Sequence, residues 1–173
     1  MAGIERACHL SGDPLTMAIN LQKGQRISLE KEAGGSLSKV VMGLGWDAVK
    51  KKGFFGGLKQ QNIDLDASAL LFDANKNLVD QVWFRQLKSK CGSLVHTGDN
   101  RTGEGEGDDE QIICHLDKVP SSVSMLVFVV NSFTGENFSQ IENACAEWKM
   151  HAIGENCSGR TFHDLLPAIT PHL

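Results

Sequence analysis

The segment Gly98–Glu110 constrains this chain more than any other. It holds six carboxylates and four glycines, with Arg101 as its single cation and no apolar residue, so it cannot form the face of a buried helix. Glycine permits sharp backbone bends that can direct several carboxylates at one point. Their mutual repulsion is large unless a cation lies among them. Two interpretations follow: a solvated acidic loop, or a site for a hard cation such as calcium, which takes about six to eight oxygen ligands.

The acidic segment does not match the EF-hand calcium loop. A loop beginning at Asp99 would place Arg101 and Gly103 at its third and fifth positions, where side-chain ligands are required. A loop beginning at Asp73 would place Leu78 where the motif requires glycine. A calcium site in this chain is therefore expected to be of another kind.

Residues 63–72 alternate in the way that strand residues do. Asp64 and Asp66 fall on one side, and that side continues into apolar residues such as Leu70. Side chains at i and i+2 lie roughly 7 Å apart on one face of a strand, and aspartate is depleted in strands. We therefore expect the two aspartates to share a partner, unless the strand begins only at Ala67 and both belong to a loop.

The remaining pattern predicts an all-β fold, a β-sandwich of mostly antiparallel strands with one or two short helices. Further strands are expected at 17–21, 26–29, 39–46, 78–86, 94–96, 112–116 and 124–133, with a hairpin turn at 73–77. Residues 47–62 are expected to form a loop, 135–150 a short helix and then a strand, and the tail from 154 no clear element. Gly43 and Gly45 share one face, which indicates that something large packs there or that the strand has a bulge.

Composition is that of one ordinary globular domain. The chain has 173 residues, 41% of them hydrophobic, and a net charge of −4, which argues against nucleic acid as a partner. No apolar run is close to the length of about 18 residues that a membrane span requires. The N-terminus lacks the apolar region of a signal peptide. Five cysteines without a CxxC pair suit a reducing compartment. We expect a cytoplasmic protein without a transmembrane segment, with peripheral membrane association left open.

A set of motifs, in order along the chain, carries a resemblance to a known family. The motifs are LQKG at 21–24, GLGWD at 43–47, DLDASA at 64–69, HTGDN at 96–100, TGEGEGDDE at 102–110, and NSF at 131–133 followed by Phe138. On these motifs the chain resembles the TerD family of tellurium-resistance and general-stress proteins over about residues 17–148. The resemblance implies a calcium-binding β-sandwich in which the motif carboxylates form adjacent sites for two calcium ions.

The resemblance also implies a division of the chain. Residues 1–16 are expected to be an N-terminal extension or tag outside the family pattern, because the family usually begins at a methionine such as Met17. Residues 17–153 would form the TerD-like calcium-binding domain. Residues 154–173 depart from the family pattern and are expected to be a divergent C-terminal tail.

The metal ligands implied by the resemblance come from the strand at 63–72, from the acidic segment and from the GLGWD motif. An alternative role for Glu110 is to hold the acidic segment in place without contacting the metal itself. Gly103 would bind the metal through its backbone carbonyl. The full expected set is Asp47, Asp64, Asp66, Asp99, Asn100, Thr102, Gly103, Glu104, Glu106, Asp108, Asp109 and Glu110.

Three functions compete at this point. The resemblance favours a calcium-binding, non-enzymatic stress-response module associated with tellurite resistance, acting with protein partners in an assembly. A second possibility is a metal-dependent hydrolase with a two-metal carboxylate site, for which His96 is the one obvious base beside the acidic segment. A third is a thiol protein that reacts directly with tellurite, although no cysteine pair is spaced for two-electron chemistry.

Overall fold

The computed structural model describes residues 28, 31, 36–47, 49–52, 58–61, 63–103, 107–135, 142–147 and 160–173. For residues 49–52, 58–61 and 142–147 it describes the backbone alone. The expected extension at 1–16 lies outside the described residues, and so do the strands expected at 17–21 and 26–29 apart from Ser28. The same is true of Glu104 and Glu106 in the acidic segment.

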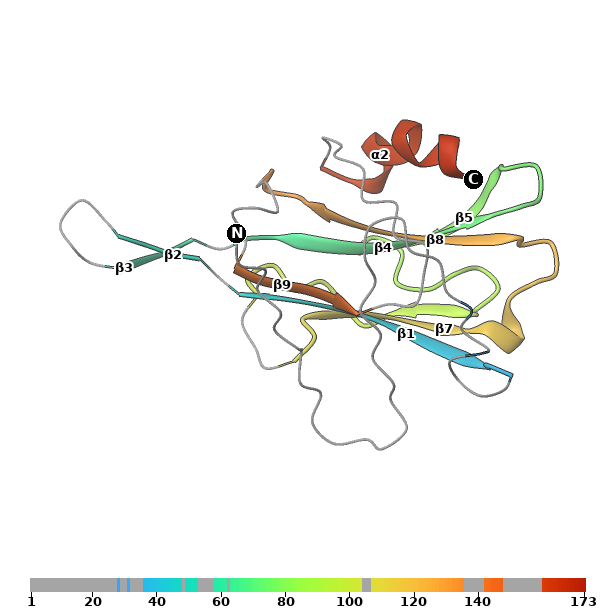
Figure 1. The fold of residues 1–173 in the computed structure, drawn as a ribbon, viewed down its shortest axis with the longest axis horizontal. Helices are drawn as coiled ribbons and strands as arrows, with labels where there is room; N and C mark the ends of the chain where they lie inside the picture. Colours follow the sequence, from blue (N-terminus) through green and yellow to red (C-terminus); the bar gives the residue numbers. More distant parts are fainter. Residues whose placement is uncertain are drawn as a thin grey trace.

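Antiparallel strands in two main sheets form the body of the molecule (Figure 1). One sheet has the order β6-β7-β1-β9, from Leu94–His96, Glu110–His115, Lys39–Asp47 and Glu142–Glu147. The other has the order β5-β4-β8, from Leu78–Val82, Leu65–Phe72 and Met125–Ser132. The prediction of an all-β fold is confirmed. Among the described residues, the helical segments are η1 (Leu116–Lys118), α2 (Phe162–Ile169) and η3 (Thr170–His172), and none is long and apolar enough to cross a membrane.

Two of the expected irregular regions are ordered elements instead. Residues 47–62, expected to be a loop, contain the paired strands β2 (Val49–Lys52) and β3 (Leu58–Gln61). The tail expected to lack structure contains helix α2, although Pro167 lies inside it. Proline disfavours helix interiors because it lacks an N–H donor, but burial of one apolar side of α2 outweighs that preference here. The strand expected after residue 135 is β9, and the helix expected before it falls on residues outside the described ranges.

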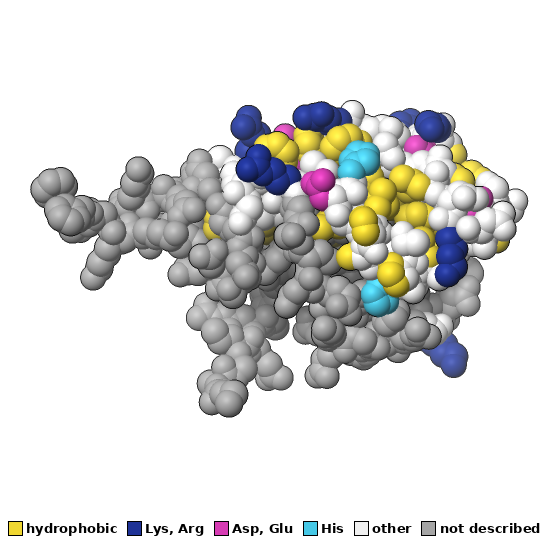
Figure 2. All heavy atoms as spheres, turned by 90° about the horizontal axis from the view of Figure 1, so that it is seen from above, with side chains coloured by type: hydrophobic (Ala, Val, Ile, Leu, Met, Phe, Trp, Pro, Cys, Tyr) yellow, Lys and Arg dark blue, Asp and Glu magenta, His cyan; other side chains and the backbone are white. Residues whose placement is uncertain are grey.

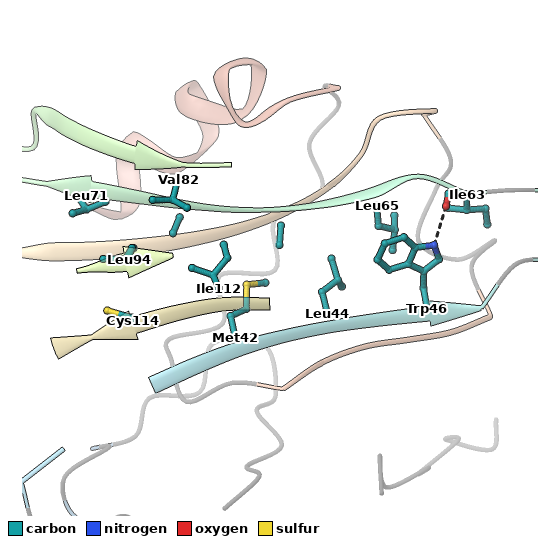
Figure 3. Close-up of a cluster of buried hydrophobic side chains, with 12 residues drawn as sticks. Met42, Leu44, Trp46, Ile63, Leu65, Leu71, Val82, Leu94, Ile112 and Cys114 are labelled. Carbon is teal, nitrogen blue, oxygen red and sulfur yellow. Dashed lines mark hydrogen bonds between the residues drawn. The ribbon is translucent and has the colours of Figure 1, made fainter. Parts of the chain in front are cut away.

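The main core lies between the two sheets. Alternation along β1 buries Met42, Leu44 and Trp46, each at most 3% exposed, against residues from β4, β6 and β7 (Figure 3). The Trp46 indole Nε1 donates a hydrogen bond of 2.8 Å to the carbonyl of Ile63, so the polar atom of this buried ring is satisfied. That bond ties the end of β1 to the residues that lead into β4.

Strand β4 is buried on both faces. In antiparallel sheets one face commonly packs on the core while the other is exposed to solvent. The second face of β4 carries Leu70 and Phe72, which pack with Val129 of β8 and with three residues of α2: Phe162, Leu165 and Ile169. Figure 1 shows α2 on the outer side of this sheet, away from β1 and β7. The helix therefore forms a third layer over the β5-β4-β8 sheet.

Removing the main side chain of this layer should destabilise the whole domain. Phe162 is fully buried and its ring meets that of Trp83 edge to face, with centroids 5.2 Å apart. We expect Phe162→Ala to lower the free energy of unfolding by about 3–5 kcal/mol in urea titrations, as large-to-small core substitutions do. Leu87→Ala, at a side chain 43% exposed, is the matched control and should change it by less than about 0.5 kcal/mol. Equal effects of the two substitutions would contradict the burial of α2.

Candidate metal centre

The acidic segment lies against the glycine face of β1. A Cβ atom on Gly43 would collide with the carboxylate of Asp108, and one on Gly45 would lie 3.0 Å from the carbonyl oxygen of Gly107. Only glycine allows the segment to approach β1 this closely. The prediction that something large packs over these two glycines is therefore confirmed, and the packing group is the acidic segment itself.

A hydrogen bond between Asn100 and Asp109 joins the two parts of the acidic segment that the structure describes. The carboxylate of Asp109 accepts hydrogen bonds from the backbone N–H of Trp46 at 2.9 Å and from Asn100 Nδ2 at 2.7 Å. Asn100 Oδ1 in turn accepts from the backbone N–H groups of Thr102 and Gly103, both at 3.1 Å. Gly103 has a φ of 64° and packs so tightly on the Trp46 indole that a Cβ atom would clash. In this arrangement the Asn100 oxygen organises the bend of the segment.

Glu110 joins the acidic segment to β4. It is the first residue of β7 and is 1% exposed. Its Oε2 accepts from the backbone N–H of Ala67 at 2.8 Å, and its Oε1 accepts from the N–H of Asn100 at 3.1 Å. Pairing of β4 with β5 reaches only to Ala69 opposite Val82, so the carboxylate takes the place of a strand partner at Ala67. Both oxygens of the Glu110 carboxylate therefore accept hydrogen bonds from the backbone. The alternative role expected for this residue, to hold the acidic segment in place, would use contacts of this kind.

His96 completes the same junction. It is 3% exposed, its Nδ1 accepts from the Gly98 N–H at 3.1 Å, and its Nε2 lies 3.2 Å from the Ala67 carbonyl and 3.4 Å from Glu110 Oε2. Since Nδ1 is an acceptor, the neutral ring carries its proton on Nε2 and donates toward Ala67. Both ring nitrogens are engaged inside the protein, so His96 does not present a base to a bound substrate.

Three predicted ligands meet in one place. Oxygen atoms of Asp64, Asp66 and Asp99 all lie within 4.8 Å of one another. Asp66 lies in β4 and is 3% exposed, Asp64 immediately precedes the strand and is 9% exposed, and Asp99 is exposed. The strand begins at Leu65, so the alternative in which it begins only at Ala67 is wrong. Two buried carboxylates from one chain segment and one exposed carboxylate from another therefore surround a common point.

The carboxylates of this cluster repel one another. Burial, followed by the negative charges of Asp64, Glu110 and Asp99, raises the pKa of Asp66 from 3.8 to about 7, against a lowering by the Asn131 hydrogen bond. Burial also raises the pKa of Asp109; a hydrogen bond from Trp46 opposes the rise, and nearby carboxylates, first that of Asp47, add to it. Oxygen donors that repel one another in this way fit a hard divalent cation, whose charge would relieve both effects.

The other predicted ligands that the structure describes are not part of this group of three. Within the residues that the structure describes, no other set of three carboxylate, histidine or cysteine side chains lies so close together. Asp47 and Asp108 lie near Asp109 and form a second acidic group beside the first. Thr102 donates to Asn100 through both its backbone N–H and its hydroxyl.

One contact residue, Asn131, was absent from the expected ligand set. It pairs with Asp66 across β4 and β8, is 3% exposed, and donates from Nδ2 to Asp66 Oδ2 at 3.1 Å. The sequence signal is an asparagine directly after the apolar run 125–130, because a buried polar side chain at the end of such a strand requires a polar partner.

The fold and this cluster define the class: an all-β domain in which an acidic, glycine-rich segment lies beside two buried aspartates at the start of a strand. A family profile for the TerD domain matches residues 17–147. The chain is 40% identical to the tellurium resistance protein TerZ of Serratia marcescens, over 85% of this chain and 94% of TerZ. It is 46% identical to the stress response protein SCP2 of Bacillus subtilis (strain 168), over 84% of this chain and 82% of SCP2.

A solved structure shares the fold. The crystal structure of a homologue of the telluride resistance protein TerD from Streptomyces coelicolor A3(2) superposes with a TM-score of 0.54 at 22% identity, covering 64% of each chain. The chain belongs to the TerD family, whose relatives above are named for tellurium resistance and stress response.

The charge of Asp66 should make the cation-free protein less stable as the pH rises. Its pKa is about 7 in the folded protein and 3.8 in its ordinary state, so the folded form binds the proton more tightly. Stability is therefore lost between about pH 4 and about pH 7. Asp66→Asn removes the charge and keeps an oxygen for the Asn131 hydrogen bond. In urea unfolding with chelator, the variant should be more stable than the wild type at about pH 8, with a smaller difference at about pH 4.

The matched control is Asp117→Asn, at an exposed aspartate in η1. This substitution also replaces one carboxylate by an amide, outside the acidic cluster, and serves as the reference against which the pH dependence of Asp66→Asn is compared. A difference for Asp66→Asn with the same pH dependence as this reference would show that the Asp66 carboxylate carries no unfavourable charge in the folded protein.

Proposed function

We propose that this protein is a calcium-binding, non-enzymatic module of the stress response, associated with tellurite resistance and acting with protein partners in an assembly. The observation that carries the proposal is the meeting of Asp64, Asp66 and Asp99, whose oxygen atoms lie within 4.8 Å of one another. Asp64 and Asp66 are buried, and burial with the negative charges of Asp64, Glu110 and Asp99 raises the pKa of Asp66 to about 7. A bound cation would favour the charged form of Asp66.

The kind of ligands at this site suits calcium better than magnesium. Oxygen ligands bind calcium at about 2.3–2.6 Å, so ligands on opposite sides of the ion are about 4.6–5.2 Å apart. For magnesium, at about 2.0–2.1 Å, the corresponding span is about 4.0–4.2 Å in a near-ideal octahedron. Oxygen atoms within 4.8 Å of one another can surround either ion, so the preference for calcium rests on the coordination geometry that each ion requires. Calcium also tolerates the irregular geometry that one strand and one loop supply together.

A second ion is proposed beside the first. Asp47, Asp108 and Asp109 bring further negative charge together, and burial with this charge raises the pKa of Asp109. Two neighbouring ions would compensate more of the carboxylates than one ion can, because one calcium shell holds about six to eight oxygens. In calorimetry, this proposal corresponds to two calcium ions per chain.

The geometry of His96 favours a binding module over a hydrolase. A hydrolase of the two-metal class needs a reactive group or water beside the metals and room for a substrate. Both nitrogens of His96 are committed to Gly98, Ala67 and Glu110, and the ring is buried. The non-enzymatic proposal rests on this commitment of the nearest base.

The thiol alternative would depend on Cys91 among the described cysteines. Burial, followed by the charge of Cys91, raises the pKa of Cys114 to about 11, so Cys114 is a poor nucleophile. Cys91 is exposed, and although burial opposes it, hydrogen bonds with Ser89 and Ser93 lower its pKa. A protein that reacts directly with tellurite would therefore use Cys91, and a calcium module would not.

Calcium should bind and stabilise the native protein. A ligand at a hundredfold excess over its Kd adds about 2.7 kcal/mol, which raises the melting temperature of a chain of this size by about 5–10 °C. Chelator should reverse the rise, and magnesium should restore little of it. In calorimetry, Asp99→Asn should weaken calcium binding at least roughly tenfold, while the control Asp117→Asn should bind as the wild type does. Equal affinity of the two variants would place the ion elsewhere.

A survival assay separates the binding module from the thiol protein. In a bacterial host where the wild-type chain confers tellurite resistance, Asp99→Asn should reduce survival, because it removes one of the three clustered carboxylates. Cys91→Ser should leave survival unchanged, since it alters only an exposed turn. The opposite pattern, with resistance lost in Cys91→Ser and kept in Asp99→Asn, would support direct reaction with tellurite.

A further inference from the structure

The side chain of Asn131 connects the acidic cluster to the C-terminal helix. Its Nδ2 atom has two protons and makes two hydrogen bonds, one to Asp66 Oδ2 at 3.1 Å and one to the backbone carbonyl of Arg160 at 2.7 Å. The residue is 3% exposed. A single buried amide therefore contacts both a candidate calcium ligand and the residue that precedes the first turn of α2.

Arg160 is held firmly to α2. The carboxylate of Asp164, in the first turn, accepts hydrogen bonds from the backbone N–H of Arg160 at 2.9 Å and of Thr161 at 3.1 Å. The helix itself is seated by Phe162, which is fully buried against the outer face of the β5-β4-β8 sheet. The position of the Arg160 carbonyl consequently depends on the docking of α2, which lies beyond the part of the chain that the TerD profile matches.

The orientation of the Asn131 amide depends on these two bonds. Its Oδ1 atom is buried and makes no hydrogen bond to the part of the chain that the structure describes. A rotation that exchanged the two ends of the amide would direct Oδ1 at the Asp66 carboxylate, where two acceptors would repel each other. The Arg160 carbonyl excludes that rotation by the same rule, since it is also an acceptor. Docked α2 thus keeps the donor end of Asn131 on Asp66.

We propose that Asn131 is a positioning residue that couples calcium binding at Asp64, Asp66 and Asp99 to the docking of α2. Hydrogen-bonded partners behind metal ligands set the orientation of those ligands, and their loss weakens metal binding by about 10- to 100-fold. By thermodynamic linkage, the factor by which docked α2 raises the affinity for calcium is also the factor by which bound calcium favours docked α2. This inference rests on the proposed calcium function and adds a response of the C-terminal helix to the ion.

Figure 2 shows the face from which this response would be observed. It views the molecule from the α2 side, where hydrophobic side chains are visible at the surface among lysine and arginine side chains. Leu70, Phe72 and Val129 lie beneath α2 and are at most 8% exposed. A shift of α2 away from the sheet would expose them, so calcium would control how much apolar surface this face presents.

Hydrogen exchange on the full chain tests the coupling without a variant that might not fold. Backbone amides of α2 should exchange about tenfold more slowly with calcium than with chelator. The internal control is the turn at Asp73–Asn77, whose hydrogen bonds lie within the turn itself. Its exchange should be the same in both conditions. The variant Asn131→Ala should still bind calcium, more weakly by about tenfold, and its α2 amides should no longer respond.

The outcomes separate this inference from the proposed function. If calorimetry shows that calcium binds the wild type but α2 exchanges at the same rate with and without it, the coupling is wrong and the calcium function stands. If α2 responds equally in the wild type and in Asn131→Ala, the coupling does not pass through Asn131. If no calcium binds the wild type, both proposals fail together. Leu165→Ala gives a further check, because loosening α2 should weaken calcium binding in the wild type but not in the Asn131→Ala background.

Discussion

The buried carboxylate of Glu110 is the interaction on which the arrangement of the acidic segment depends. It accepts hydrogen bonds from Ala67 in β4 and from Asn100 in the segment, so it joins the two sheets to the acidic segment. A charge at 1% exposure is tolerated only when its hydrogen bonds are complete. Because β5 pairs no further than Ala69, the edge of β4 has the open N–H and carbonyl groups that Glu110 and His96 use.

The same junction determines where negative charge accumulates. With the segment fixed beside β4, Asp99 meets Asp64 and Asp66, and their repulsion and burial raise the pKa of Asp66 to about 7. The folded protein therefore holds a set of oxygen donors in place at an energetic cost before any ion arrives. This arrangement is what the proposed calcium site requires, and Asn131 links it by hydrogen bonds to the start of α2, the layer that covers the far side of β4.

The sequence predicted features that depend on local periodicity. Alternation along 63–72 placed Asp64 and Asp66 together, and the shared face of Gly43 and Gly45 indicated a close packing partner. It did not predict the Glu110–Ala67 bond, whose partners are 43 residues apart, or the Asn131–Asp66 bond, whose partners are 65 apart. Helix α2 was missed because it is short and contains Pro167, while the apolar face of β4 that stabilises it lies far away in the sequence.

A crystal structure of the protein grown with calcium tests the central claim most directly. The account predicts an ion within about 2.3–2.6 Å of oxygen atoms from Asp64, Asp66 and Asp99, with both oxygens of Glu110 still on the backbone of Ala67 and Asn100. Anomalous scattering would identify the ion as calcium. Density for calcium only at other residues, or none near these three aspartates at saturating calcium, would contradict the account.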